Sequence, residues 1–106
     1  MQMLAVTSCP SGVAHTYMAA EALENAAREK GWEVKVETQG SYGIENRIEP
    51  EDIKKADFVL LTKDIAIKDE DRFVGKRIIR VGVADAVKKA PQIIDQIEKK
   101  LESITD

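Results

Sequence analysis

Two kinds of apolar pattern alternate along this chain of 106 residues, and their alternation restricts the folds that it can adopt. Residues 3–7 form a short, continuous apolar run, which is typical of a strand covered on both faces. Over 14–30, apolar residues recur at spacings of three and four and Gly31 follows, which predicts a helix with a glycine C-cap. Three further strands are predicted, at 32–37, 58–62 and 78–81.

Helices are expected between and after the later strands. Pro50 begins a short helix that reaches Ala56, residues 65–73 are a candidate for another, and Pro91 begins the last helix. Strands that alternate with helices predict parallel strands joined by right-handed crossovers, which is an α/β fold with four strands in a small open sheet. The polar segment 38–49 is expected to be a long loop at the carboxyl edge of the sheet, where ligands bind in such folds.

Length and composition exclude several classes of protein. A chain of 106 residues predicts a single domain, residues 1–106, with one core. A net charge of -3 argues against nucleic-acid binding, which requires clustered Lys and Arg. No apolar run approaches the ~20 residues that cross a bilayer, and no signal peptide is evident, so a cytoplasmic protein is expected. A single cysteine excludes an internal disulfide or a multi-cysteine zinc site, and no cofactor or metal is expected.

The segment CPSGVAHT, from Cys9 to Thr16, joins the first predicted strand to the first predicted helix. At a helix N-terminus, free backbone N–H groups and a macrodipole equivalent to roughly half a positive charge favour an anion. The same field lowers the pKa of a thiol below its usual ~8.5, which makes Cys9 a candidate nucleophile. The candidate phosphate-binding residues follow Pro10 and are Ser11, Gly12, Val13, Ala14, His15 and Thr16.

Other interpretations of these residues stay open. Cys9 could be a buried, inert residue, although such cysteines favour strand and helix interiors. His15 could brace the loop, pair with the thiolate or simply occupy the first helical turn. Asp64 follows the third strand on the same edge, where a helix-capping role is favoured over a catalytic one. Four residues of the long loop are predicted to rim the site, unless they form a turn without ligand contacts: Thr38, Gln39, Gly40 and Ser41.

Three phosphate-loop chemistries can be compared with this segment. A Walker loop needs Gly-Lys followed by a hydroxyl residue, and the absence of Lys excludes it. A cysteine phosphatase places an Arg six positions after its Cys to grip the phosphate, and His15 stands at that position here. Without the Arg, hydrolysis loses its strongest electrostatic support, which suits a carrier whose thiophosphate must survive. An arsenate reductase of the thiol type would need further cysteines.

Two long segments resemble the fructose-type enzyme IIB domain of the bacterial phosphoenolpyruvate-dependent sugar phosphotransferase system. They are CPSGVAHTYMAAEAL, from Cys9 to Leu23, and KVETQGSYGIEN, from Lys35 to Asn46. The similarity extends through 56–57, 62–65 and 72–76, so it covers nearly the whole chain, and the tail after Val83 is less recognisable.

This resemblance implies that Cys9 is the phosphorylated residue. It would receive phosphate from a phosphohistidine of enzyme IIA and give it to a sugar held by membrane enzyme IIC, and these two proteins are the expected partners at the inner face of the membrane. The expected fold is α/β, a small three-layer, doubly wound sheet of four parallel strands in the order 2-1-3-4, with the phosphate-binding loop after strand 1. A cysteine-dependent phosphatase and a non-catalytic regulatory module stay open as alternatives.

Overall fold

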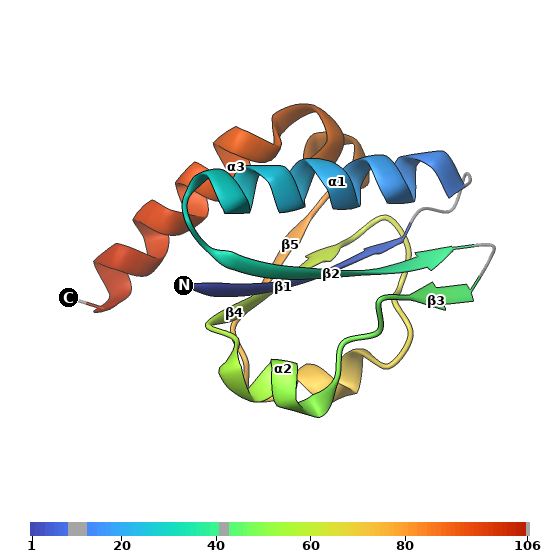
Figure 1. The fold of residues 1–106 in the computed structure, drawn as a ribbon, viewed down its shortest axis with the longest axis horizontal. Coiled ribbons are helices and arrows are strands. Elements are labelled where there is room, and N and C mark those ends of the chain that lie inside the picture. The colour runs from blue at the N-terminus through green and yellow to red at the C-terminus, as the bar shows by residue number, and fades with distance from the viewer. Residues whose placement is uncertain (9–12, 41–42, 106) are drawn as a thin grey trace.

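The chain forms a five-stranded sheet between two layers of helices (Figure 1). The computed structural model describes residues 1–8, 13–40 and 43–105. The strands lie in the order β3-β2-β1-β4-β5, and every neighbouring pair is parallel except β2 and β3. Their bounds are β1 (Gln2–Ser8), β2 (Glu33–Gly40), β3 (Gly43–Glu45), β4 (Phe58–Thr62) and β5 (Ile78–Val81). The predicted α/β class with a mostly parallel sheet is confirmed.

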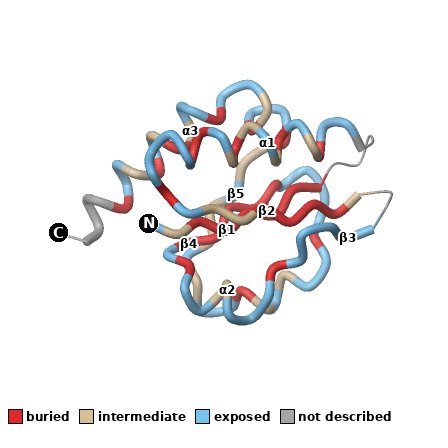
Figure 2. The backbone as a smooth tube through the Cα atoms, in the orientation of Figure 1, coloured by how far each residue is buried: buried red, intermediate tan, exposed pale blue. Residues whose placement is uncertain are grey.

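Helices cover both faces of this sheet (Figure 1). One face carries α1 (Val13–Glu29) and α3 (Val83–Thr105), which pack against each other, and the other carries α2 (Pro50–Lys55) and the 3-10 helix η1 (Glu70–Phe73). Buried residues concentrate in the central strands, whereas the outer sides of the helices are exposed (Figure 2). The three layers place the amino ends of the four parallel strands at one edge and their carboxyl ends at the other.

The central strand β1 divides the core into two parts because its side chains point alternately to the two faces. Met3 and Ala5 belong to the cluster beneath α1 and α3, and Leu4 and Val6 belong to the cluster on the other face. All four side chains are buried. This double coverage explains why residues 3–7 form a continuous apolar run instead of an alternating one.

The prediction of four strands is wrong because the segment 38–49 is not wholly a loop. β2 continues to Gly40, and β3 pairs with it antiparallel, Gly40 lying opposite Gly43. Gly43 has a φ of 95°, in the left-handed region that favours glycine. Polar residues of this stretch concealed the end of β2, because the side chain of Gln39 is buried and makes hydrogen bonds to Glu37 and Lys68.

Two helical predictions also need correction. The last helix begins at Val83 and not at Pro91, and its regular geometry is interrupted at Lys89, where φ is -127° and ψ is 25°. A proline lacks an N–H donor and clashes with the preceding turn, so a kink two residues before Pro91 lets the helix continue through it. Within 65–73, helical structure is limited to η1 at 70–73, preceded by Asp69 in a left-handed conformation with φ of 60°.

The end of α1 provides a first test of the fold. Gly31 has a φ of 79°, and its N–H and that of Trp32 donate to the carbonyls of Arg28 and Ala27. A Cβ at Gly31 would meet no atom within 4 Å. We therefore expect Gly31→Ala to lower the free energy of unfolding by about 1–2 kcal/mol through backbone strain alone. Gly31→Asn should cost less, because Asn enters the left-handed region more readily; urea denaturation of the two variants measures the difference, and equal losses would contradict it.

Candidate functional site

The candidate site lies at the carboxyl edge of the sheet, between the end of β1 and the start of α1. β1 ends at Ser8 and α1 begins at Val13. Cys9 follows Ser8 directly in the sequence and lies outside the described residues. The predicted strand and helix on either side of the cysteine segment are thus confirmed, and the site can be built from the described residues that surround it.

Ser8 is fixed by hydrogen bonds to both neighbouring strands. Its N–H donates to Thr62 Oγ1 at 3.0 Å, and Thr62 Oγ1 donates to the Ser8 carbonyl at 3.1 Å. On the other side, Ser8 Oγ donates to the main-chain carbonyl of Gln39 at 3.0 Å. Ser8 is buried, as are both partners. The residue that precedes Cys9 is therefore held between β2 and β4.

Buried hydroxyls gather at this edge on the face that α1 covers. Thr7 Oγ1 donates to the carbonyl of Thr16, in the first turn of α1, at 3.1 Å. Thr7 lies opposite Thr38 in the β1–β2 pairing. Thr16 Oγ1 and Thr38 Oγ1 are both buried, and neither has a hydrogen-bond partner within the described ranges. Buried polar atoms usually have a hydrogen-bond partner, so these two hydroxyls stand out among the described residues at this edge.

The structure describes some of the other predicted loop residues and leaves others outside the described ranges. Ser11, Gly12 and Ser41 lie outside the described residues, as does the side chain of Val13, whose backbone begins α1. Ala14 and His15 are exposed in the first turn of α1. No hydrogen bond of the His15 side chain is seen within the described part of the chain, and its bracing and proton-transfer roles stay predictions. Gly40 ends β2 beside the site.

Asp64 has a structural role that can be tested separately. Its Oδ1 accepts a hydrogen bond from the N–H of Val83, the first residue of α3, at 2.6 Å. A carboxylate at this place satisfies a free donor and complements the helix dipole, so the capping interpretation is confirmed. Its place on the rim of the site stays a prediction.

We expect Asp64→Ala to lower the free energy of unfolding by about 1 kcal/mol, because the N–H of Val83 loses its acceptor. Asp64→Asn retains a side-chain oxygen and should cost less. Thermal denaturation measures both variants against the parent chain. If Asp64 were instead an acid or base in phosphoryl transfer, Asp64→Asn would stop the transfer although it lowers the stability only slightly.

A buried ion pair that the sequence did not reveal lies beside the site. Glu37, in β2, is fully buried and contacts Arg72 of η1 through two hydrogen bonds, Nη2 to Oε2 at 2.6 Å and Nη1 to Oε1 at 2.9 Å. Glu37 also accepts from the N–H of Ile48 at 2.8 Å and from Gln39 Nε2 at 2.8 Å. Bidentate pairing of this kind is the strongest geometry available to Arg and a carboxylate.

The protonation of Glu37 follows from these contacts. Burial raises its pKa, but the hydrogen bonds from Arg72, Gln39 and the Ile48 N–H together outweigh burial, so the pKa of Glu37 falls below its ordinary value. Glu37 is therefore ionised at neutral pH. The guanidinium of Arg72 also lies over the ring of Phe73, 4.7 Å from its centroid. The pair thus connects β2 to η1 as a charged contact, in which Arg72 Nε is buried and has no hydrogen-bond partner among the described residues.

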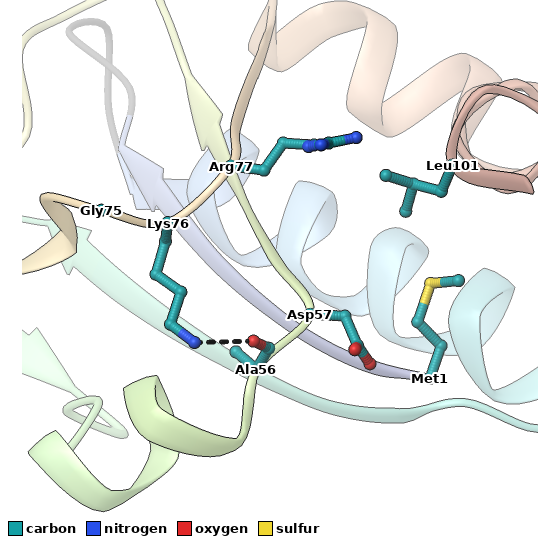
Figure 3. Close-up of a pocket in the computed structure, with 7 residues that line it drawn as sticks. All are labelled: Met1, Ala56, Asp57, Gly75, Lys76, Arg77 and Leu101. Carbon is teal, nitrogen blue, oxygen red and sulfur yellow. Dashed lines mark hydrogen bonds between the residues drawn. The ribbon is translucent and has the colours of Figure 1, made fainter. Parts of the chain in front are cut away.

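A cavity of about 660 Å³ lies at the opposite, amino edge of the sheet (Figure 3). It is lined by residues that precede β1, β4 and β5, among them Asp57, Lys76 and Arg77. Two of its charged groups already serve the fold: Asp57 accepts from the N–H of Gln2 at 2.7 Å, and Lys76 donates to the carbonyl of Ala56 at 3.0 Å. Despite its size, this cavity is remote from the cysteine segment and is not the candidate site.

Comparison with known proteins identifies the family. Residues 4–96 match the family described as PTS system, Lactose/Cellobiose specific IIB subunit, where PTS denotes the phosphotransferase system. The PTS system fructose-like EIIB component 2 of Escherichia coli K12 is 65% identical over 100 residues, which is 94% of each chain. The chain belongs to the fructose-like EIIB components of the PTS. The resemblance found in the sequence is confirmed, and an EIIB component is a phosphotransferase in sugar transport.

Further relatives agree with the fold, and one of them joins a B part to a C part. The solution structure of the Enzyme IIB subunit of the PTS system from E. coli K12 superposes with a TM-score of 0.92 at 41% identity, covering 99% of this chain and 97% of that one. The fructose-like PTS system EIIBC component of E. coli K12 is 44% identical over 99 residues, 92% of this chain and 20% of the relative. In that relative, B and C parts share one chain. None of the described helices is long and apolar enough to span a membrane.

Proposed function

We propose that the Cys9 thiolate accepts a phosphoryl group from a phosphohistidine of an EIIA protein and gives it to a sugar held by a membrane EIIC protein. The observation that carries this proposal is the place of Cys9, the chain's single cysteine, directly after the buried end of β1 and four residues before α1. Fructose or a fructose-like sugar is the proposed acceptor, since the similar EIIB and EIIBC proteins carry that name. Transfer takes place at the inner face of the membrane.

The reaction proceeds in two displacements. In the first, the thiolate sulfur attacks phosphorus, an S–P bond forms, the N–P bond breaks and the donor histidine leaves with its electron pair. In the second, a sugar hydroxyl attacks phosphorus, an O–P bond forms and Cys9 leaves as a thiolate. The hydroxyl proton passes to a base that we place on the EIIC partner. Binding groups that face the three equatorial oxygens stabilise both transition states.

Residues 11–16 are proposed to bind those oxygens, mainly through backbone N–H groups at the start of α1. A helix of 17 residues begins at Val13, and no acidic residue lies in its first turn. Its N-terminus therefore favours a dianionic phosphoryl group. The buried hydroxyl of Thr16, which has no hydrogen-bond partner among the described residues, supports a ligand at this place. Thr38 Oγ1, at the same edge, is a second candidate donor.

Phosphorylation of the full chain by phosphoenolpyruvate and the upstream carrier proteins tests the proposal. We expect one phosphoryl group, mapped by mass spectrometry to the peptide that contains Cys9, which disappears when EIIC membranes and fructose are added. Steady release of inorganic phosphate without sugar would instead support a phosphatase. Retention of the phosphoryl group in the presence of EIIC and every sugar tested would support a regulatory module.

A further inference from the structure

We propose that Glu37, Gln39 and Arg72 form a positioning unit, here called the Gln39 clamp, for the strand end that carries Cys9. The inference rests on the proposed function in one respect, that Cys9 is the phosphoryl acceptor. None of the three residues is assigned a chemical step. Their role is to hold the main chain at the carboxyl edge in one place, so that the sulfur and the phosphate-binding groups keep a constant geometry.

The first part of the clamp fixes the side chain of Gln39. Its Nε2 donates to Glu37 Oε2 at 2.8 Å and to the carbonyl of Lys68 at 3.1 Å, and its Oε1 accepts from the N–H of Lys68 at 2.8 Å. Both donors of the amide and its acceptor are therefore engaged. Arg72 in turn fixes Glu37 by the bidentate pair. A surface glutamine at the end of a strand would have no such constraint.

The second part of the clamp connects the fixed residue Gln39 to Ser8. The main-chain carbonyl of Gln39 accepts the hydrogen bond from Ser8 Oγ, and the two residues lie opposite each other in the β1–β2 pairing. Hydrogen bonds thus connect Arg72 to Glu37 and Glu37 to the Gln39 side chain, and the covalent frame of Gln39 connects that side chain to the carbonyl that binds Ser8, the residue before Cys9. Ser8 keeps its separate contacts with Thr62, so loss of the clamp loosens this strand end without detaching it.

The burial of the three clamp residues favours a positioning role over contact with a partner protein. Glu37 is 0% exposed, Gln39 is 7% exposed, and the Arg72 side chain is 14% exposed. A donor protein cannot reach Glu37 and can touch little of the other two. Changes to the clamp should therefore alter the rate of transfer within the complex, kcat, and leave the KM for the phosphorylated donor unchanged.

The first test is Gln39→Met, which removes the side-chain amide but leaves the ion pair and the main-chain carbonyl. Small misplacements of reacting groups are costly, so we expect kcat for phosphorylation by EIIA to fall about ten- to a hundredfold, with an unchanged KM. The matched control is Arg28→Met. It removes the exposed Arg28–Glu24 pair at the far end of α1 and should leave both constants at the parent values.

The double variant Glu37→Met with Arg72→Met separates positioning from stability. Replacing both members of a buried ion pair with apolar side chains is often neutral or stabilising. We therefore expect a melting temperature well above that of the single variant Arg72→Met, because no charge stays buried, but below that of the parent chain, because the buried N–H of Ile48 loses its acceptor. The Gln39 amide nevertheless loses Glu37, so kcat should stay about ten- to a hundredfold low, as in Gln39→Met.

The possible results distinguish this inference from the proposed function. If the phosphoryl group of the parent chain maps to Cys9 while both clamp variants keep the parent kcat, the clamp does not position the site and the carrier function stands. A rise in KM at constant kcat would equally overturn positioning. If the parent chain is phosphorylated elsewhere than Cys9, the proposed function fails and the clamp inference fails with it.

Discussion

Replacing Cys9 by serine is expected to reduce phosphoryl acceptance by on the order of a thousandfold or more, because the reaction loses its thiolate. A serine hydroxyl stays protonated at neutral pH, whereas a thiol near a helix N-terminus ionises readily. The exchange of sulfur for oxygen changes size little. Intact-mass measurement after incubation with phosphoenolpyruvate, the upstream carriers and EIIA shows directly whether the variant gains a phosphoryl group.

Two companion variants make this result specific to Cys9. Cys9→Ala removes any nucleophile at this position and should behave like Cys9→Ser, while the melting temperatures of both show whether the fold is kept. His15 is the other nucleophile in the segment, and His15→Gln should still accept the phosphoryl group. Full phosphorylation of Cys9→Ser together with its loss in His15→Gln would move the acceptor to the histidine and contradict the mechanism.

The strands that could be predicted are those whose burial is visible in their own residues. The segment 58–62 is apolar except for Thr62, and the structure places β4 at Phe58–Thr62, buried along its whole length. β3 could not be recognised in the same way, because Gly43–Glu45 is short, has one apolar residue and is a strand through its pairing with β2. The start of α3 was missed for another reason: Pro91 resembles a start signal, whereas the kink at Lys89 accommodates it inside a longer helix.

The part of the candidate site that could be predicted is the part formed by consecutive residues of the sequence. Cys9 lies between a strand and a helix because both are local patterns in the sequence, and the ends of β1 and α1 confirm those patterns. The Glu37–Arg72 pair was not predictable. Glu37 lies on the face of the sheet that α2 and η1 cover, and its partner stands 35 positions away in the sequence. Such long-range pairing is fixed by tertiary packing and leaves no periodic signal.

Removal of Arg72 should have the largest effect on stability, because it leaves Glu37 as a buried charge without its main partner. Breaking a buried pair from one side typically costs about 3–5 kcal/mol, and we expect this loss for Arg72→Met at neutral pH. The Ile48 N–H and Gln39 still donate to Glu37, but the two guanidinium bonds and the contact with the Phe73 ring are gone. Urea denaturation monitored by Trp32 fluorescence measures the change, and the exposed-pair variant Arg28→Met serves as the control.

The pH dependence of that loss shows whether the uncompensated carboxylate is its cause. In the parent chain the pKa of Glu37 is lowered on folding, so its contribution is complete above the unfolded pKa and is lost as the pH falls through the folded pKa. Arg72→Met removes two of the hydrogen bonds that lower this pKa, so the folded pKa of Glu37 is higher in the variant than in the parent chain, and the folded variant takes up its proton at a higher pH. The difference in unfolding free energy between the two chains should therefore narrow as the pH falls from neutral toward about 4.3, the ordinary pKa of a glutamate. A free-energy difference that stays constant over this range would mean that lost packing, and not the uncompensated charge of Glu37, destabilises the variant.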